Sequence, residues 1–283
     1  MICLKGAGVV LKKILGNIEE SSVEVDSSTM DYVSFGRGDK ALVIIPGLGD
    51  GLKTVKGTGL MLWYIYRFLS RDYKVYVFSR KNELKTGYTT RDIAQDLAEA
   101  MEKLDITSSA VMGVSQGGMI AQWLAIDYPA KVDRLAIVIS LARQNETVQE
   151  VIGSWVEMVR EERYAELAVD MMEKSHTEKY LKRVRPFYWL IKRISKPQSK
   201  KRFLIQAQSC LTHDAYQELS AIKCPTFIIG GAADRIVGGE AVQQEIAAAI
   251  PDSELFIYPD LGHGAYVEAK DFGERIYNFF KDG

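Results

Sequence analysis

The chain has 283 residues, of which 47% are hydrophobic and 26% are charged. This composition excludes a disordered chain and can bury a sizeable core, as one large domain or as one domain that carries an insertion. The formal net charge of −1 argues against nucleic-acid binding through bulk charge, because such domains usually carry a strong basic excess.

The first segment in chain order, residues 1–16, mixes short apolar stretches with lysines. It is too short to span a membrane and lacks the order of regions found in a signal peptide. We therefore expect a soluble N-terminal segment, with amphipathic membrane contact as the alternative. Cys3, Cys210 and Cys224 are odd in number and lack metal-ligand spacing, which indicates reduced thiols in a cytoplasmic protein without a metal site.

Apolar runs of strand length alternate with helical patterns along most of the chain. An antiparallel hairpin is predicted first, from residues 22–26 and 31–35. Later runs are apolar over most of their length, as in strands buried on both faces of a parallel sheet, and they cover residues 41–45, 74–78, 109–114, 135–139, 226–229 and 254–258. Amphipathic helical spacing recurs between them, at residues 93–104, 119–124, 242–250 and 272–280. The predicted fold class is α/β, with a sheet covered by helices.

Directly after the predicted strand 41–45, the chain reads Pro46-Gly47-Leu48-Gly49-Asp50. A glycine-rich loop at this place leaves backbone N–H groups free to point into a site. A purely structural glycine turn is the alternative. If the loop is functional, the N–H of Leu48 is the donor that it supplies.

The segment Gly113-Val114-Ser115-Gln116-Gly117 lies between a predicted strand and a predicted helix. Glycines two positions before and after the serine permit a sharp turn, and such a turn presents the serine hydroxyl as a nucleophile. The N–H of Gln116 would then pair with that of Leu48 to stabilise a negatively charged oxygen. These two groups form the predicted oxyanion hole.

The regular alternation stops after Ser140 and resumes near Cys224. Helical spacing between these points predicts an all-helical insertion, residues 144–219, between the two parts of a core domain, 1–143 and 220–283. Aromatic residues of the insertion can line an apolar pocket, and Trp155 and Trp189 are the candidates. For any single aromatic residue, a place in the core of the insertion is the simpler interpretation.

Ten basic residues and no acidic ones lie between Lys179 and Arg202. A run of like charges is usually a solvated helical face, and that is the prediction here. Contact with an anion or a membrane surface is the less favoured alternative.

A serine nucleophile needs a base, and the chain has three histidines. His263 lies in a glycine-rich loop directly after the last predicted strand, where active sites of parallel sheets form. We predict that His263 is the base, and we expect His176 and His213 to be solvated.

The base in turn needs a carboxylate that orients it. Asp234 follows the predicted strand 226–229 on another loop at a carboxyl end, so it is the predicted acid. Capping of the helix that begins near Gly239 is its alternative role. Glu146, beyond the predicted strand 135–139, is the next candidate for the acid.

With the chain order Ser115, Asp234, His263, the sequence resembles the α/β-hydrolase superfamily from about Ser22 onward. The segment from Gly113 to Pro129 is similar to the elbow helix of its esterase, lactonase and C–C hydrolase branches. The resemblance implies an eight-stranded, mostly parallel sheet with helices on both faces, a helical lid after the sixth strand, and a catalytic triad of these three residues.

Two segments depart from patterns that are frequent in this superfamily. Pro46-Gly47 stands where many members have His-Gly, which leaves the backbone donor of Leu48 in place. The fourth strand is followed by Ser79-Arg80-Lys81-Asn82-Glu83-Leu84 instead of Asp-x-Arg-Gly-x-Gly-x-Ser. Substrate assignments that depend on that loop therefore do not transfer.

From these observations we expect a cofactor-independent serine hydrolase that acts on a small carboxylic ester, lactone or thioester with an apolar acyl group. The reaction would pass through an acyl-enzyme on Ser115. Alternatives are C–C bond hydrolysis or acyl transfer with the same triad, and a ligand-binding protein without catalysis. We expect no nucleic-acid partner and do not favour membrane contact; the oligomeric state stays open, a homodimer included.

Overall fold

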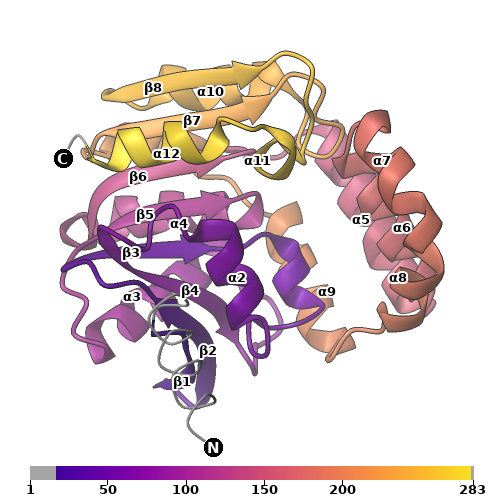
Figure 1. The fold of residues 1–283 in the computed structure, drawn as a ribbon, viewed down its shortest axis with the longest axis horizontal. Coiled ribbons are helices and arrows are strands. Elements are labelled where there is room, and N and C mark those ends of the chain that lie inside the picture. The colour runs from indigo at the N-terminus through magenta and orange to yellow at the C-terminus, as the bar shows by residue number, and fades with distance from the viewer. Residues whose placement is uncertain (1–16, 282–283) are drawn as a thin grey trace, which may run out of the picture.

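Eight strands form one sheet at the centre of the computed structural model, which describes residues 17–281 (Figure 1). The strand order is β1-β2-β4-β3-β5-β6-β7-β8. The pairs β1/β2 and β2/β4 are antiparallel and all others are parallel, as predicted. The strands are β1 (Glu19–Val25), β2 (Ser28–Phe35), β3 (Lys40–Ile45), β4 (Tyr73–Lys81), β5 (Ser109–Val114), β6 (Val132–Val138), β7 (Thr226–Gly231) and β8 (Ser253–Tyr258). The N-terminal segment 1–16, with Cys3, lies outside the described residues.

The burial of each strand follows its place in the sheet. Every residue of the central strands β5 and β7 is buried, which is why these strands read as continuous apolar runs. The edge strand β1 is exposed over its first four residues. A two-residue turn joins β1 to β2, and Asp26 adopts a φ of 53° there, a conformation that aspartate tolerates.

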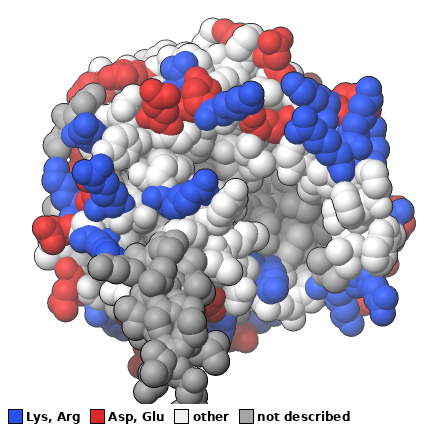
Figure 2. All heavy atoms as spheres, viewed as in Figure 1, with Lys and Arg blue, Asp and Glu red and all other residues white. Residues whose placement is uncertain are grey.

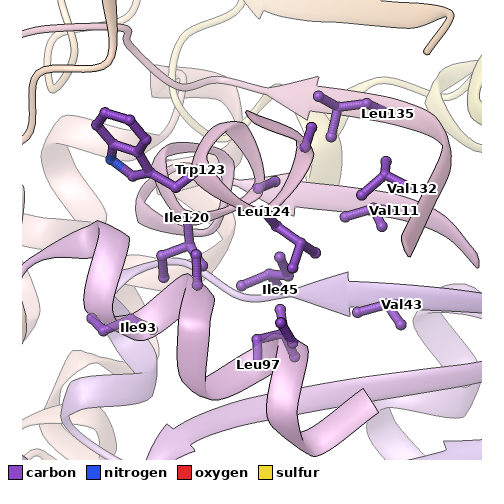
Figure 3. Packing of buried hydrophobic residues seen from close by; sticks show 14 of the residues in the cluster. Val43, Ile45, Ile93, Leu97, Val111, Ile120, Trp123, Leu124, Val132 and Leu135 are labelled. Carbon is purple, nitrogen blue, oxygen red and sulfur yellow. The ribbon is translucent and has the colours of Figure 1, made fainter. Parts of the chain in front are cut away.

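Helices cover both faces of the sheet and create one apolar cluster on each. The cluster on the first face joins the sheet to α3 (Thr90–Lys103), α4 (Gln116–Asp127) and α10 (Glu240–Ala249). Figure 3 shows part of it, with Ile93 and Leu97 of α3 and Ile120 and Leu124 of α4 over the strands. The cluster on the second face joins the sheet to α2 (Gly59–Tyr66) and α12 (Phe272–Lys281). The interior strands of the sheet are thus shielded from water on both sides, as buried parallel strands require.

Five α-helices lie between β6 and β7, and we call residues 144–219 the cap. The two chain ends of the cap meet at the core, where the Ala215 N–H donates to the Ala142 carbonyl at 2.8 Å. The backbones of Arg143 and Asp214 form an isolated antiparallel β-bridge beside this bond. Strands β6 and β7 therefore pair directly despite the long insertion. The cap helices are α5 (Glu146–Arg160), α6 (Tyr164–Ser175), α7 (Glu178–Val184), α8 (Tyr188–Ile194) and α9 (Lys200–Leu211).

The last cap helix, α9, packs on the core as well as on the cap. A third apolar cluster joins Phe203 and Ala207 of α9 to Val148 of α5 and to Leu48 and Met119 of the core. The short 3₁₀ helix that follows runs past the predicted boundary of the insertion at residue 219, since it spans Tyr216–Ala221. Among residues 17–281, no helix combines the length and the apolar character needed to cross a bilayer.

Candidate active site

Ser115 occupies the sharp turn between β5 and α4, with φ 55° and ψ −120°. Glycine is required on both sides, because a Cβ on Gly117 would lie 1.9 Å from the Ile45 carbonyl oxygen and one on Gly113 would lie 2.3 Å from that of Gly117. Such a backbone costs on the order of 1–3 kcal/mol and persists only where its surroundings hold it. Here the Ser140 hydroxyl donates to the Ser115 carbonyl at 2.8 Å.

His263 and Asp234 form a hydrogen-bonded chain with Ser115, as their placement after strands predicts. The distance from His263 Nε2 to Ser115 Oγ is 3.0 Å, and the distance from His263 Nδ1 to Asp234 Oδ2 is 2.8 Å. The other carboxylate oxygen of Asp234 accepts the backbone N–H groups of Ile236 at 2.8 Å and Val237 at 3.1 Å. Asp234 thus has a fixed orientation, with one oxygen reserved for the imidazole.

This arrangement can move a proton. A carboxylate that accepts a hydrogen bond from Nδ1–H leaves the lone pair of a neutral imidazole on Nε2, which faces the Ser115 hydroxyl. The ring can then take the hydroxyl proton while Asp234 stabilises the resulting imidazolium. Glu146, the alternative acid, is exposed in the first turn of α5.

The predicted oxyanion loop lies against Ser115, the predicted nucleophile. A Cβ on Gly47 would lie 3.3 Å from Ser115 Cβ and 3.7 Å from Ser115 Oγ. Leu48 is the first residue of a 3₁₀ helix, Leu48–Gly51, and Gln116 is the first residue of α4. The N–H groups of first helical residues have no acceptor within their own helix, so both are available to a negatively charged ligand atom.

The structure places the two candidate pocket tryptophans differently. Trp155 has 3% of its surface exposed and packs inside the cap, where its indole N–H donates to Asp170 at 2.7 Å. Trp189 on α8 is 65% exposed. The role of both residues in substrate binding stays a prediction, and only Trp189 offers surface for it in this conformation.

The prediction that His213 and His176 are solvated is wrong. His213 is 1% exposed, with Nδ1 2.8 Å from the Thr90 hydroxyl and its ring edge-on to Trp123. Burial lowers the pKa of His213 to about 3. His176 is largely buried, with Nδ1 3.0 Å from a Glu268 oxygen. Tertiary packing, which the local sequence does not reveal, decides the burial of both rings.

The buried His213 should make the free energy of unfolding fall in mild acid. Its folded pKa lies below the ordinary value of about 6.5, so between pH 6.5 and about 3 the unfolded chain binds a proton that the folded chain does not. The free energy of unfolding then falls as the pH drops, by up to about 1.4 kcal/mol per pH unit for this group. Urea denaturation of His213→Asn should show a shallower pH slope than the wild type. Equal slopes would mean that His213 takes up its proton in the folded state.

The basic stretch from Lys179 to Arg202 is mostly a solvated face, and basic side chains gather on the cap in Figure 2. Arg185 forms ion pairs with Glu173 and Glu178. Arg202 departs from the prediction, because its side chain is buried against Asp50 of the core.

Within residues 17–281, no group of three or more His, Cys, Asp or Glu residues is arranged to hold a metal ion.

The alpha/beta hydrolase fold family matches this chain over residues 40–270. The chain belongs to the α/β-hydrolase superfamily. A relative from Klebsiella pneumoniae subsp. pneumoniae, named "Putative carbamate hydrolase RutD", is 28% identical over 247 residues, which cover 83% of this α/β-hydrolase and 88% of the relative.

Two solved structures share the fold of this α/β-hydrolase. The enol-lactonase from Burkholderia xenovorans superposes with a TM-score of 0.80 at 20% identity, over 92% of this chain and all of the other. The meta-cleavage product hydrolase from Pseudomonas fluorescens superposes with a TM-score of 0.76 at 18% identity, over 95% of this chain and 99% of the other. At these identities the likeness concerns the fold alone.

The surface of this α/β-hydrolase is hollowed between the core and the cap (Figure 2). Helix α2 lies on the core side of this hollow and α8 on the cap side (Figure 1). Large apolar side chains are exposed on or beside these helices: Leu60, Met61, Tyr64 and Ile65 at α2, and Phe187, Trp189 and Leu190 at α8. Both the core-side helix and the cap-side helix thus carry exposed apolar side chains.

Proposed function

We propose that this α/β-hydrolase is a cofactor-independent serine hydrolase that cleaves a small carboxylic ester, lactone or thioester. The proposal rests on one observation, the continuous hydrogen-bond chain from Ser115 Oγ through His263 to Asp234. In that chain a hydroxyl, a base and an orienting carboxylate have the geometry that acyl transfer needs.

In the proposed mechanism, Ser115 Oγ attacks the carbonyl carbon of the substrate while His263 Nε2 takes the hydroxyl proton. The N–H groups of Leu48 and Gln116 stabilise the negative charge that develops on the carbonyl oxygen. Protonated His263 then donates its proton to the leaving group, and an acyl-enzyme remains on Ser115. A water molecule that His263 deprotonates attacks this ester in turn and restores the free serine.

The exposed apolar side chains of α2 and α8, the helices on the two sides of the hollow, support a substrate with an apolar acyl group. The RutD relative is named for carbamate hydrolysis, so carbamates belong in the first substrate panel. The proposed compartment is the cytoplasm, because Cys210 and Cys224 are free thiols and reduced cysteines are typical there.

Two assays together test the proposal. A fluorophosphonate probe should label the wild type at Ser115, and mass spectrometry of the labelled peptide identifies the position. A panel of p-nitrophenyl esters of graded chain length, lactones, a thioester and a carbamate should then define the substrate class. Folded protein that takes no label and turns over none of these compounds would instead be a ligand-binding member of the superfamily.

Truncating Trp189 should change the preference for acyl chain length. Trp189→Ala removes exposed apolar surface from α8, the helix on the cap side of the hollow, and one methylene in an apolar pocket is worth about 1–3 kcal/mol in discrimination. The ratio of kcat/KM between butyrate and octanoate esters should therefore shift, whereas Leu255→Ala on the distant edge strand β8 should leave it unchanged. Trp155→Ala should mainly lower the free energy of unfolding, by about 3–5 kcal/mol. An unchanged ratio in Trp189→Ala would remove that residue from the binding surface.

A further inference from the structure

A buried polar cluster lies behind the oxyanion loop, and the proposed mechanism does not use it. It consists of Asp50, Arg80 and Arg202, which we call the Asp50 cluster and which are 4%, 1% and 5% exposed. Asp50 belongs to the loop itself, Arg80 to the end of β4, and Arg202 to the cap helix α9. Charged groups at this depth are costly, so their arrangement calls for an explanation.

Arg202 ties the loop to the end of β4. Its Nη2 lies 2.5 Å from Asp50 Oδ2, and its Nη1 donates to the Asp50 carbonyl. The same guanidinium donates to the carbonyls of Arg80 at 3.0 Å and Lys81 at 3.1 Å. The Arg80 N–H also donates to Asp50 Oδ2, at 3.1 Å. A cap side chain thus fixes both the position and the orientation of the 3₁₀ helix that Leu48 begins.

Arg80 contacts both halves of the predicted oxyanion hole. Its Nη2 donates to the Pro46 carbonyl at 2.5 Å and to Gln116 Oε1 at 3.0 Å. The Pro46 carbonyl belongs to the peptide unit that leads into Gly47 and Leu48, so this bond restricts the direction of the loop. The side chain of Gln116 also donates to α9, at the Gln206 carbonyl, 2.8 Å away. Both backbone donors are therefore positioned by groups that converge on one cluster.

From these contacts we infer that Arg80 and Arg202 are positioning residues for the oxyanion hole, and that the cap helix α9 thereby sets the catalytic power of the core. The inference rests on the proposed serine hydrolase function. Backbone donors stabilise a transition state only when they are held in place before the reaction. Two guanidinium groups against one carboxylate also leave a net positive charge behind the hole, which favours an anion there.

The experiment uses the rate at which a fluorophosphonate labels Ser115, because the phosphonyl oxygen occupies the oxyanion hole during that reaction. Arg202→Met and Arg80→Met should each lower the second-order labelling rate about 10- to 100-fold, since loss of one oxyanion donor costs on the order of 10²- to 10³-fold. With an ester substrate, kcat should fall by a similar factor while KM stays within about twofold. Inhibition by a trifluoromethyl ketone, which forms a tetrahedral adduct, should weaken in parallel with kcat/KM.

Three further variants separate positioning from general stability. Lys81→Met is a matched control, because Lys81 follows Arg80 on β4, is equally buried and pairs with Asp96 at 2.9 Å, away from the Asp50 cluster. It should lower the melting temperature and leave the labelling rate unchanged. If Arg202→Met does not fold, the double variant Asp50→Asn/Arg202→Met removes the orphaned charge, and Arg202→Lys should restore part of the rate.

Each outcome decides the question. Labelling rates within threefold of the wild type in folded Arg80→Met and Arg202→Met, or in the double variant, would overturn the inference while the proposed function stands. An equal loss of rate in Lys81→Met would also overturn it, since the effect would then follow from destabilisation. A wild-type protein that takes no label would overturn the proposed function and the inference together.

Discussion

Replacing Ser115 with alanine should lower kcat by on the order of 10⁶-fold, as loss of the nucleophile does in a serine protease. The hydroxyl is the attacking atom of the proposed mechanism, and its hydrogen-bond partner within residues 17–281 is His263. The fold should survive, because alanine keeps the Cβ that this turn already accommodates and no core volume is lost. Measurement of kcat with the best ester, together with circular dichroism, checks both parts.

The exposed Ser27 in the β1–β2 turn supplies the control, since Ser27→Ala removes a hydroxyl far from the site and should leave kcat unchanged. Turnover by Ser115→Ala at close to the wild-type rate would end the proposal that Ser115 is the nucleophile. The residual rate expected instead, on the order of 10³- to 10⁴-fold over water, comes from the oxyanion hole and from substrate binding.

Asp234→Asn should lower kcat by on the order of 10⁴-fold with little change in structure. Asp234 Oδ1 accepts two backbone N–H groups, so an asparagine would keep its carbonyl oxygen on Ile236 and Val237. Its NH₂ group would then face His263 Nδ1 and act as a donor. Because Nδ1 must accept that bond, the ring proton moves to Nε2, where it faces Ser115 and prevents proton abstraction.

Steady-state kinetics and chemical denaturation of Asp234→Asn test this prediction. Glu146→Gln is the companion variant, because Glu146 was the alternative acid and lies exposed on α5. We expect it to match the wild type. A loss below tenfold in Asp234→Asn would show that another carboxylate orients the base.

The order of the elements and the proximity of Ser115, His263 and Asp234 could be predicted from the sequence because they depend on local signals. Buried parallel strands are continuous apolar runs, so the predicted strand 109–114 coincides with β5. The turn at Ser115 can be predicted from Gly113 and Gly117, because no larger residue fits at either position. The loops of Asp234 and His263 follow the parallel strands β7 and β8, so the carboxyl edge of the sheet brings them together.

The remaining features depend on tertiary contacts that leave no periodic signal. Helix α2, Gly59–Tyr66, is apolar on all sides, so its pattern does not mark it as a helix. Strand β4 runs on to Lys81, three residues past the predicted end. The predicted strand ends early because Ser79, Arg80 and Lys81 are polar, although the structure buries all three. Arg202 looks like one more charge in a basic run, and only the fold shows that its guanidinium lies in the core.

The chain leaves the core for the cap helices at Ala142 and returns to it at Ala215, and these two residues lie side by side. Such a junction accepts inserts of different length, since each doubling of a closed loop costs only about 0.6 kcal/mol. Recombination at this junction would therefore place the cap of another protein over the same candidate active site. The crossover point matters: a chimera that exchanges residues 144–198 keeps Arg202 on its native helix, whereas one that exchanges the whole insertion discards it. The segment that can be exchanged without loss of Arg202, residues 144–198, is thus shorter than the whole insertion.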